Sequence, residues 1–126
     1  MIKKEGEGWR IIIDPSRENF TTLIGGEDWA IELNKSEWKD LVKVVMDLSD
    51  QYKSVKSQLM GDEDITLELE RSPWLAILKG DQYGWNLRLI LSDSGLLNRG
   101  AEVYWPKHVA KHVANAMRTM WDSDYL

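Results

Sequence analysis

The feature that most constrains this chain of 126 residues is the order of two hydrophobic periodicities, which occurs twice along the sequence. Segments in which apolar and polar residues alternate run into segments whose apolar residues recur every three or four positions. The first period is that of a half-buried strand, and the second is that of an amphipathic helix. The order strands, long helix, strands, helix predicts an α+β fold of antiparallel sheet units that are each followed by a helix.

In the first half, three strands are expected before the long helix. Gly8 to Asp14 is a β-branched run, and Phe20 to Ile24 is a second strand candidate. Gly25-Gly26 then predicts a tight hairpin turn, because glycine adopts positive φ freely. Trp29 to Leu33 alternates again, with its odd-numbered residues directed inward.

The long helix has both a start signal and an apolar stripe. Asn34-Lys-Ser-Glu37 fits a capping box, which predicts a helix that starts here and runs to about Ser57. Its apolar residues recur at three- and four-residue steps: Trp38, Leu41, Val42, Val45, Leu48, Tyr52 and Val55. Most charged residues of this segment fall off the stripe and are expected to form a solvated face.

The second half repeats the order after Gly61 to Asp64, which we expect to break the helix. Four strands are predicted: Ile65–Arg71, Trp74–Lys79, Gly84–Ser92 and Ala101–Trp105. Residues 80–84 form the turn of a hairpin, and residues 92–100 a polar loop that carries Leu96-Leu97. Pro106 opens the second helix. The stripe predicted for that helix is Val109, His112, Val113, Ala116, Met117 and Met120.

Length and pattern together predict a single domain over residues 1–126, since this is the commonest domain size. The apolar stripes of the two helices can be laid on each other, and an alternating strand runs straight into each helix. We therefore predict a degenerate internal repeat with halves 1–61 and 62–126.

The residues that could carry catalysis or bind a metal are few. With no Cys, a disulfide framework, a thiolate zinc cluster and a cysteine nucleophile are excluded. His108 and His112 stand four apart on the second helix, but no third ligand accompanies them, so no metal site is expected. Asp62 to Asp64 indicates a solvated turn, and Ser92-Asp-Ser94 has no evident His or Lys partner. Because the nucleophile elbow, the dinucleotide fingerprint and the phosphate loop are also missing, neither an enzyme nor a cofactor is expected.

Targeting signals are also lacking. The longest uncharged apolar runs are far below the ~18 residues of a membrane span. Met1 to Glu5 lacks the apolar stretch of a signal peptide. The sequence predicts a cytoplasmic protein that does not associate with a membrane, and it specifies no oligomeric state.

Tryptophan is unusually abundant, with 7 Trp against 1 Phe. Most of these residues are expected to fill the core of a chain that is poor in Phe. The alternative is an aromatic platform for bases or for a partner protein, which requires some of them on the surface.

Charge is distributed unevenly and leads to two hypotheses for function. Residues 1–64 carry a net charge of −5 and residues 65–121 one of +2. Basic and aromatic residues interleave in the second half, as in a groove for single-stranded nucleic acid. Lys79 and Arg88, outward on neighbouring hairpin arms, are the predicted phosphate contacts, and Tyr83 in the turn is the predicted stacking residue. The alternative is a small protein-interaction or assembly factor, which the acidic pI of about 5.0 favours.

Several short motifs carry a family resemblance. They are Glu7-Gly-Trp-Arg10, Trp29-Ala-Ile-Glu-Leu33 before the Trp38 helix, Gly84-Trp85, Arg99-Gly-Ala-Glu-Val103 and Trp105-Pro106. Over nearly its whole length the chain resembles a family of small cyanobacterial and plastid-lineage proteins with a domain of unknown function, family 1818.

This resemblance implies a fold similar to that of Whirly proteins and the transcriptional coactivator p15, in which strands-then-helix units alternate. Related proteins of that fold bind single-stranded DNA, so the resemblance favours a non-catalytic nucleic-acid-associated or regulatory module. No motif for DNA contact can be matched here, and no binding residue is carried over. A shared fold does not establish a shared function.

Overall fold

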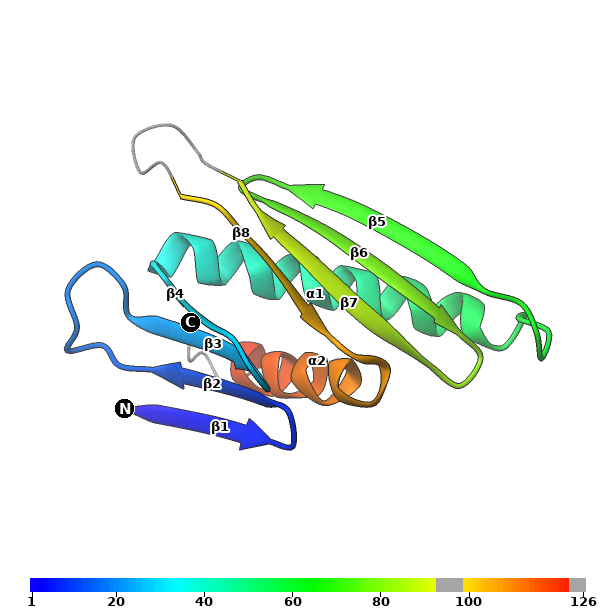
Figure 1. The fold of residues 1–126 in the computed structure, drawn as a ribbon, viewed down its shortest axis with the longest axis horizontal. Coiled ribbons are helices and arrows are strands. Elements are labelled where there is room, and N and C mark those ends of the chain that lie inside the picture. The colour runs from blue at the N-terminus through cyan, green and yellow to red at the C-terminus, as the bar shows by residue number, and fades with distance from the viewer. Residues whose placement is uncertain (93–98, 123–126) are drawn as a thin grey trace.

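The computed structural model describes residues 1–92 and 99–122 (Figure 1). In this part of the chain, four strands and a helix are followed by four more strands and a second helix. The elements of the first half are β1 (Ile2–Gly6), β2 (Trp9–Ile13), β3 (Thr22–Gly26), β4 (Ala30–Leu33) and α1 (Lys35–Lys56). Those of the second half are β5 (Ile65–Arg71), β6 (Trp74–Asp81), β7 (Gly84–Leu91), β8 (Ala101–Trp105) and α2 (Lys107–Asp122).

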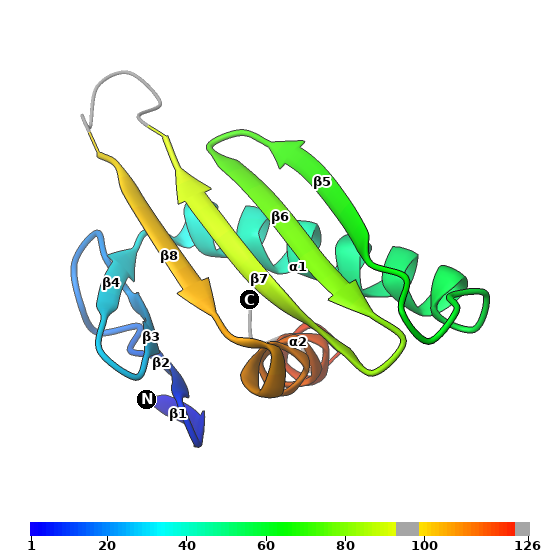
Figure 2. The ribbon, with the colours of Figure 1, turned by 45° about the vertical axis from the view of Figure 1, so that its right-hand side comes forward.

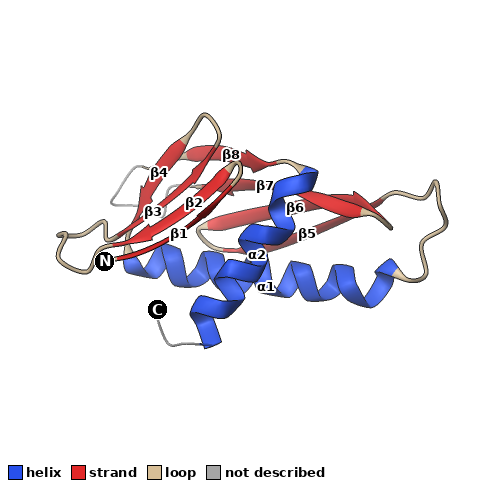
Figure 3. Cartoon of the chain, turned by 90° about the horizontal axis from the view of Figure 1, so that it is seen from below, coloured by secondary structure: helices blue, strands red, loops and turns tan. Residues whose placement is uncertain are grey.

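The strands form two antiparallel sheets. The first sheet has the order β1-β2-β3-β4 and the second has the order β5-β6-β7-β8. Both helices lie on one side of the second sheet (Figure 3), and its other face has no helix over it in either frontal view (Figures 1 and 2). The α+β class and the antiparallel strand groups are therefore confirmed.

The helix α1 starts where its capping box predicts. The backbone N–H of Glu37 donates to Oδ1 of Asn34 over 2.8 Å, and the N–H of Asn34 donates to Oε1 of Glu37 over 2.9 Å. Ser57 is the C-cap. All of the predicted stripe is buried except Val55, which is half-buried.

The main core lies between the second sheet and the two helices. Alternate residues of β6 and β7 point toward α1 and α2, and the largest of them are Trp74 and Trp85, followed by Leu78, Leu87 and Leu89. Both helices contact this sheet, α1 through β5 and β6 and α2 through β7. The helix α2 buries Val109, Val113, Met117 and Met120 of its predicted stripe.

The first half has four strands in the structure, one more than the sequence pattern predicted. The missed strand is β1, whose residues Lys3, Lys4 and Glu5 give it no apolar alternation. It pairs with β2 across a turn at Glu7-Gly8, where Gly8 has a φ of +79°. Because β1 is an edge strand with exposed charges, hydrophobic periodicity does not detect it.

The prediction of a turn at Gly25-Gly26 is wrong, and so is the boundary of the strand before it. Both glycines are buried in β3, which starts at Thr22 and not at Phe20. The turn follows them, and Gly26 N–H donates to the carbonyl of Trp29 over 2.9 Å. Here glycine is required for close packing of neighbouring side chains and not for a turn.

The sequence pattern predicts His112 on the core stripe of α2, and this prediction is also wrong. His108 and His112 are both exposed, and Ala110 and Ala114 take the buried positions next to Val109 and Val113. Leu96-Leu97, most of the predicted loop and Asp93-Ser94 lie outside the described residues.

Candidate functional site

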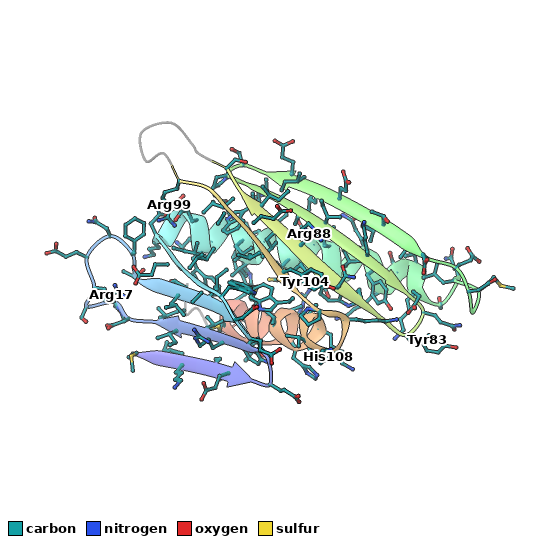
Figure 4. All side chains as sticks on the ribbon, viewed as in Figure 1. Arg17, Tyr83, Arg88, Arg99, Tyr104 and His108 are labelled. Atoms are coloured by element: carbon teal, nitrogen blue, oxygen red, sulfur yellow. The ribbon has the colours of Figure 1, made fainter. Side chains whose placement is uncertain are left out.

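The three residues predicted to bind nucleic acid lie on the β6–β7 hairpin, where Figure 4 labels Tyr83 and Arg88. Lys79 and Arg88 are exposed, and Tyr83 in the turn is 75% exposed. The turn is fixed by Asp81, whose Oδ1 accepts from the N–H of Tyr83 over 2.8 Å and whose Oδ2 accepts from Nζ of Lys107 over 2.6 Å. The hydrogen bond from Lys107, followed by that from Tyr83, lowers the pKa of Asp81. The turn therefore presents Tyr83 to solvent at one end of the sheet.

Arg88 lies away from Tyr83, at the centre of the outer face. Its Nη1 donates to Oε1 of Glu102 over 3.0 Å, and its guanidinium lies 5.7 Å from the ring centroid of Tyr104 (Figure 4). Tyr104 is 40% exposed. An oligonucleotide phosphate would have to compete with the carboxylate of Glu102 for this guanidinium.

Most other basic residues of the second half are also paired with acids. The ion pairs are Arg71–Asp40, Arg99–Glu37, Lys107–Asp81 and Arg118–Asp50. Three of the aromatic residues proposed to lie between them, Trp74, Trp85 and Trp105, are buried in the core. Most of the tryptophans are core fillers, and these three cannot stack on bases.

A larger depression lies elsewhere, between turns of the first sheet and the start of α2. It is a cleft of about 440 Å³ between the β1–β2 turn, the β3–β4 turn and the start of α2. Its lining residues are Glu5, Gly6, Glu7, Gly8, Trp9, Arg10, Gly26, Glu27, Asp28, Trp29, Tyr104, Pro106, His108 and Val109. A second hollow of about 310 Å³ extends it along α2 to His112. We refer to this depression as the Trp9–Trp29 cleft.

Two half-buried indoles and two glycines form part of the lining. Gly6, Trp9 and Gly26 are neighbours across β1, β2 and β3. A Cβ at Gly6 would lie 2.4 Å from Nε1 of Trp9, and a Cβ at Gly26 would lie 2.2 Å from Nε1 of Trp29. Each indole therefore lies directly over a glycine, and no other residue would leave room for it.

Trp29 also joins the first sheet to the second. Its Nε1 donates to the carbonyl of Tyr104 over 3.0 Å, and its ring lies 5.2 Å from that of Trp105. Nε1 of Trp105 donates to the carbonyl of Gly25 over 3.0 Å. These contacts hold Trp29 in place although its turn is exposed.

Acidic side chains surround the indoles. Glu5, Glu7, Glu27 and Asp28 are exposed carboxylates, against which the lining sets one guanidinium, that of Arg10. Glu5 pairs with Lys3 at 3.6 Å. Within residues 1–92 and 99–122, no ion pair involves Glu7, Glu27 or Asp28. His108 stands on the opposite side, at the start of α2 (Figure 4).

Aromatic faces beside carboxylates are the groups that proteins use to bind cations, through cation–π contacts and charge-assisted hydrogen bonds. The sequence pattern did not predict this cleft, although Trp9 and Trp29 both lie in recognisable motifs. The sequence signal for the cleft is that each tryptophan follows a glycine and an acidic residue, in Glu7-Gly-Trp9 and Gly26-Glu-Asp-Trp29. That the two motifs meet depends on the pairing of β2 with β3.

Comparison with protein families identifies the chain. A family model described as a domain of unknown function, DUF1818, matches residues 4–120. The chain belongs to the DUF1818 family. This confirms the family part of the resemblance, while the likeness to Whirly proteins is not part of the match.

The DUF1818 chain is also similar to a solved structure from the cyanobacterium Prochlorococcus sp. NATL2A, described as a protein with unknown function from the DUF155 family. The two share 81% sequence identity with a TM-score of 0.92, over 96% of this chain and 99% of that one. No curated protein matches the chain.

Two negative observations hold for the described residues. Neither α1 nor α2 has the length and apolar character needed to cross a membrane. No group of three or more His, Cys, Asp or Glu is arranged to hold a metal ion in residues 1–92 and 99–122.

Proposed function

We propose that this DUF1818 chain is a non-catalytic module that binds a partner protein through the Trp9–Trp29 cleft. The observation that carries the proposal is the combination of half-buried indoles with carboxylates that have no ion-pair partner among the described residues. A surface of this sign repels nucleic acid and attracts a basic protein segment. Aromatic residues are also enriched in protein interfaces.

The charge pattern of the second half supports the same choice. A nucleic-acid groove needs unpaired cations, since its affinity comes mainly from neutralised phosphates. In this chain Arg88 is paired with Glu102, and Glu68 and Glu70 also lie on the outer face of the second sheet. Of the three residues predicted to bind nucleic acid on the hairpin, this leaves Lys79 as the exposed cation and Tyr83 as the exposed aromatic residue.

The proposal is tested by affinity capture from a cyanobacterial lysate, with and without nuclease. The bait is the wild type, a cleft variant Glu27→Lys, Asp28→Lys, and a matched control Glu68→Lys, Glu70→Lys on the second sheet. The proposal is supported if a protein is captured by the wild type and by the control in the presence of nuclease, but is not captured by the cleft variant. The proposal is overturned if nuclease treatment abolishes the capture, or if the cleft variant captures the same protein as the wild type.

Single-stranded nucleic acid remains a second candidate, favoured by the exposure of Lys79 and Tyr83 at the hairpin. Oligonucleotide binding, followed by Trp fluorescence, should then weaken steeply with salt, by about 0.7 in log K per log salt for each phosphate contact. It should also be lost in Lys79→Glu, Arg88→Glu. Absence of binding by the wild type at low salt would exclude this candidate.

A further inference from the structure

We propose that the Trp9–Trp29 cleft binds an arginine side chain of the partner, with its guanidinium stacked on an indole and hydrogen-bonded to the carboxylates of Glu27 and Asp28. This inference rests on the proposed function and specifies what the cleft recognises.

The shape of the site suits a planar cation. Since Gly6 and Gly26 have no Cβ, the indoles of Trp9 and Trp29 pack closely against the backbone at these glycines. A guanidinium is planar and stacks on an aromatic face, whereas an ammonium is a compact point charge that keeps its hydration shell more strongly. An indole face therefore favours arginine over lysine.

The charge of the site favours the same ligand. Glu27 and Asp28 are adjacent in the β3–β4 turn beside Trp29, and both line the cleft. Arg10, the one lining guanidinium, donates to the carbonyl of Gly26 over 3.5 Å. Its charge therefore offsets only part of the four carboxylates, and a ligand cation gains a net attraction. The fork of N–H donors on a guanidinium also matches carboxylate oxygens in pairs.

The size of the site fits a side chain together with its backbone. The cleft measures about 440 Å³, and the hollow beside it, which Glu7, His108 and His112 line, adds room along α2. A volume in this range is that of sites for small molecules. A peptide could therefore place an arginine on the indoles and continue past His108.

The test titrates the full chain with the peptide acetyl-Gly-Arg-Gly-amide. Binding is measured from the indole N–H resonances in two-dimensional NMR. The 7 tryptophans give 7 such resonances. We expect those of Trp9 and Trp29 to shift on titration, while those of the buried Trp38, Trp74 and Trp85 stay in place. The corresponding lysine peptide should bind several-fold more weakly than the arginine peptide. The neutral citrulline peptide should bind at least about tenfold more weakly.

Two variants of the cleft test the carboxylates and the indole separately. Glu27→Gln, Asp28→Asn removes the charge and should abolish the shifts, while the matched Glu68→Gln, Glu70→Gln should retain them. Gly6→Ala displaces the Trp9 indole and should also weaken binding about tenfold. Thermal melting of each variant verifies that it is folded.

The outcomes separate this inference from the proposed function. Equal binding of the arginine and citrulline peptides, no shifts, or shifts confined to other tryptophans would overturn the inference. If the cleft variant still loses its captured partner in that case, the proposed function stands and only the ligand is wrong. If the cleft variant also captures the partner as well as the wild type does, both the inference and the proposed function are wrong.

Discussion

The two sheets have the same number of strands and the same antiparallel order, but they are supported differently. In the second sheet, β6 and β7 have 8 residues each and both helices cover one face. The first sheet has strands of 4 or 5 residues and buries Ile11, Ile24 and Leu33 in the same core, while hydrogen bonds of Trp29, Arg99 and Trp105 also join it to the second half. The second sheet therefore forms the larger, helix-covered part of the core, and the first leaves the half-buried Trp9 and Trp29 accessible to a ligand.

The attachment of the first sheet is clearest at Arg99. Its Nε donates to Oε2 of Glu37 over 3.1 Å, and its Nη2 donates to the carbonyl of Glu32 on β4. The guanidinium also lies 4.5 Å from the ring centroid of Phe20. One residue thus joins the chain before β8 to the first sheet and to the start of α1.

The largest expected effect breaks the support of the second sheet. Val45 is completely buried on α1, so Val45→Asp places an unpaired carboxylate in the core. We expect a loss of about 4 kcal/mol or more in the free energy of unfolding, and a chain that is mostly unfolded by circular dichroism. Asp47→Val, at an exposed position of the same helix, is the control. An unchanged melting temperature of Val45→Asp would show that α1 does not carry the core.

The second prediction breaks the attachment of the first sheet. Arg99→Leu leaves Glu37, which is 6% exposed, without its ion-pair partner. Because Arg99 itself is 25% exposed, we expect a loss of about 2 kcal/mol, below the cost for a fully buried pair.

Hydrogen exchange should locate that loss. It should rise in β3 and β4 before it rises in β6 and β7. Arg17→Leu is the matched control, because Arg17 pairs with Glu32 over 3.0 Å at the surface and should contribute less than about 1 kcal/mol. Equal exchange in both sheets would contradict the difference in support that we describe.

A smaller effect is expected at the junction of the first sheet with α1. Asn34→Ala removes the acceptor for the N–H of Glu37 and should cost about 1 kcal/mol in urea unfolding. Ser36→Ala, in the exposed first turn, should cost much less. If the two variants were equally stable, the capping box would contribute nothing.

The fourth prediction concerns pH and the hairpin of the second sheet. The pKa of Asp81 is lowered by the hydrogen bond from Lys107, so the folded state favours its ionised form. This contribution to stability is present above the unfolded pKa of about 3.9 and is lost as pH falls through the lower folded value. Asp81→Asn should therefore show a smaller loss of stability between pH 6 and pH 3 than the wild type does. A pH dependence identical to that of the wild type would contradict the assignment, and Asp47→Asn is the comparison variant.

The smallest effect is expected on removal of metal. His108 and His112 are exposed on α2, and in the described residues neither Glu7, which lines the same hollow, nor another side chain completes a group arranged to hold a metal ion. Dialysis against a strong chelator should leave the melting temperature unchanged. Stoichiometric zinc that is lost in His108→Ala would contradict this prediction.

The sequence determined the elements that depend on local periodicity and on caps. Val45 and Leu87 lie in patterns that only a buried helix face and a buried strand face satisfy, and Asn34 marks a helix start by its own hydrogen bonds. These features depend on neighbours within a few residues, which the sequence displays. The family motifs, such as Trp105-Pro106, were visible for the same reason.

The tertiary structure decided which of these residues are accessible and which charges are paired. Arg88 and Glu102 are far apart in the sequence, and only the register of β7 with β8 brings them together. The cleft likewise requires the pairing of β2 with β3 and the packing of β8 beside Trp29. Contacts between distant segments depend on how whole sheets pack, and no local pattern of residues encodes that packing.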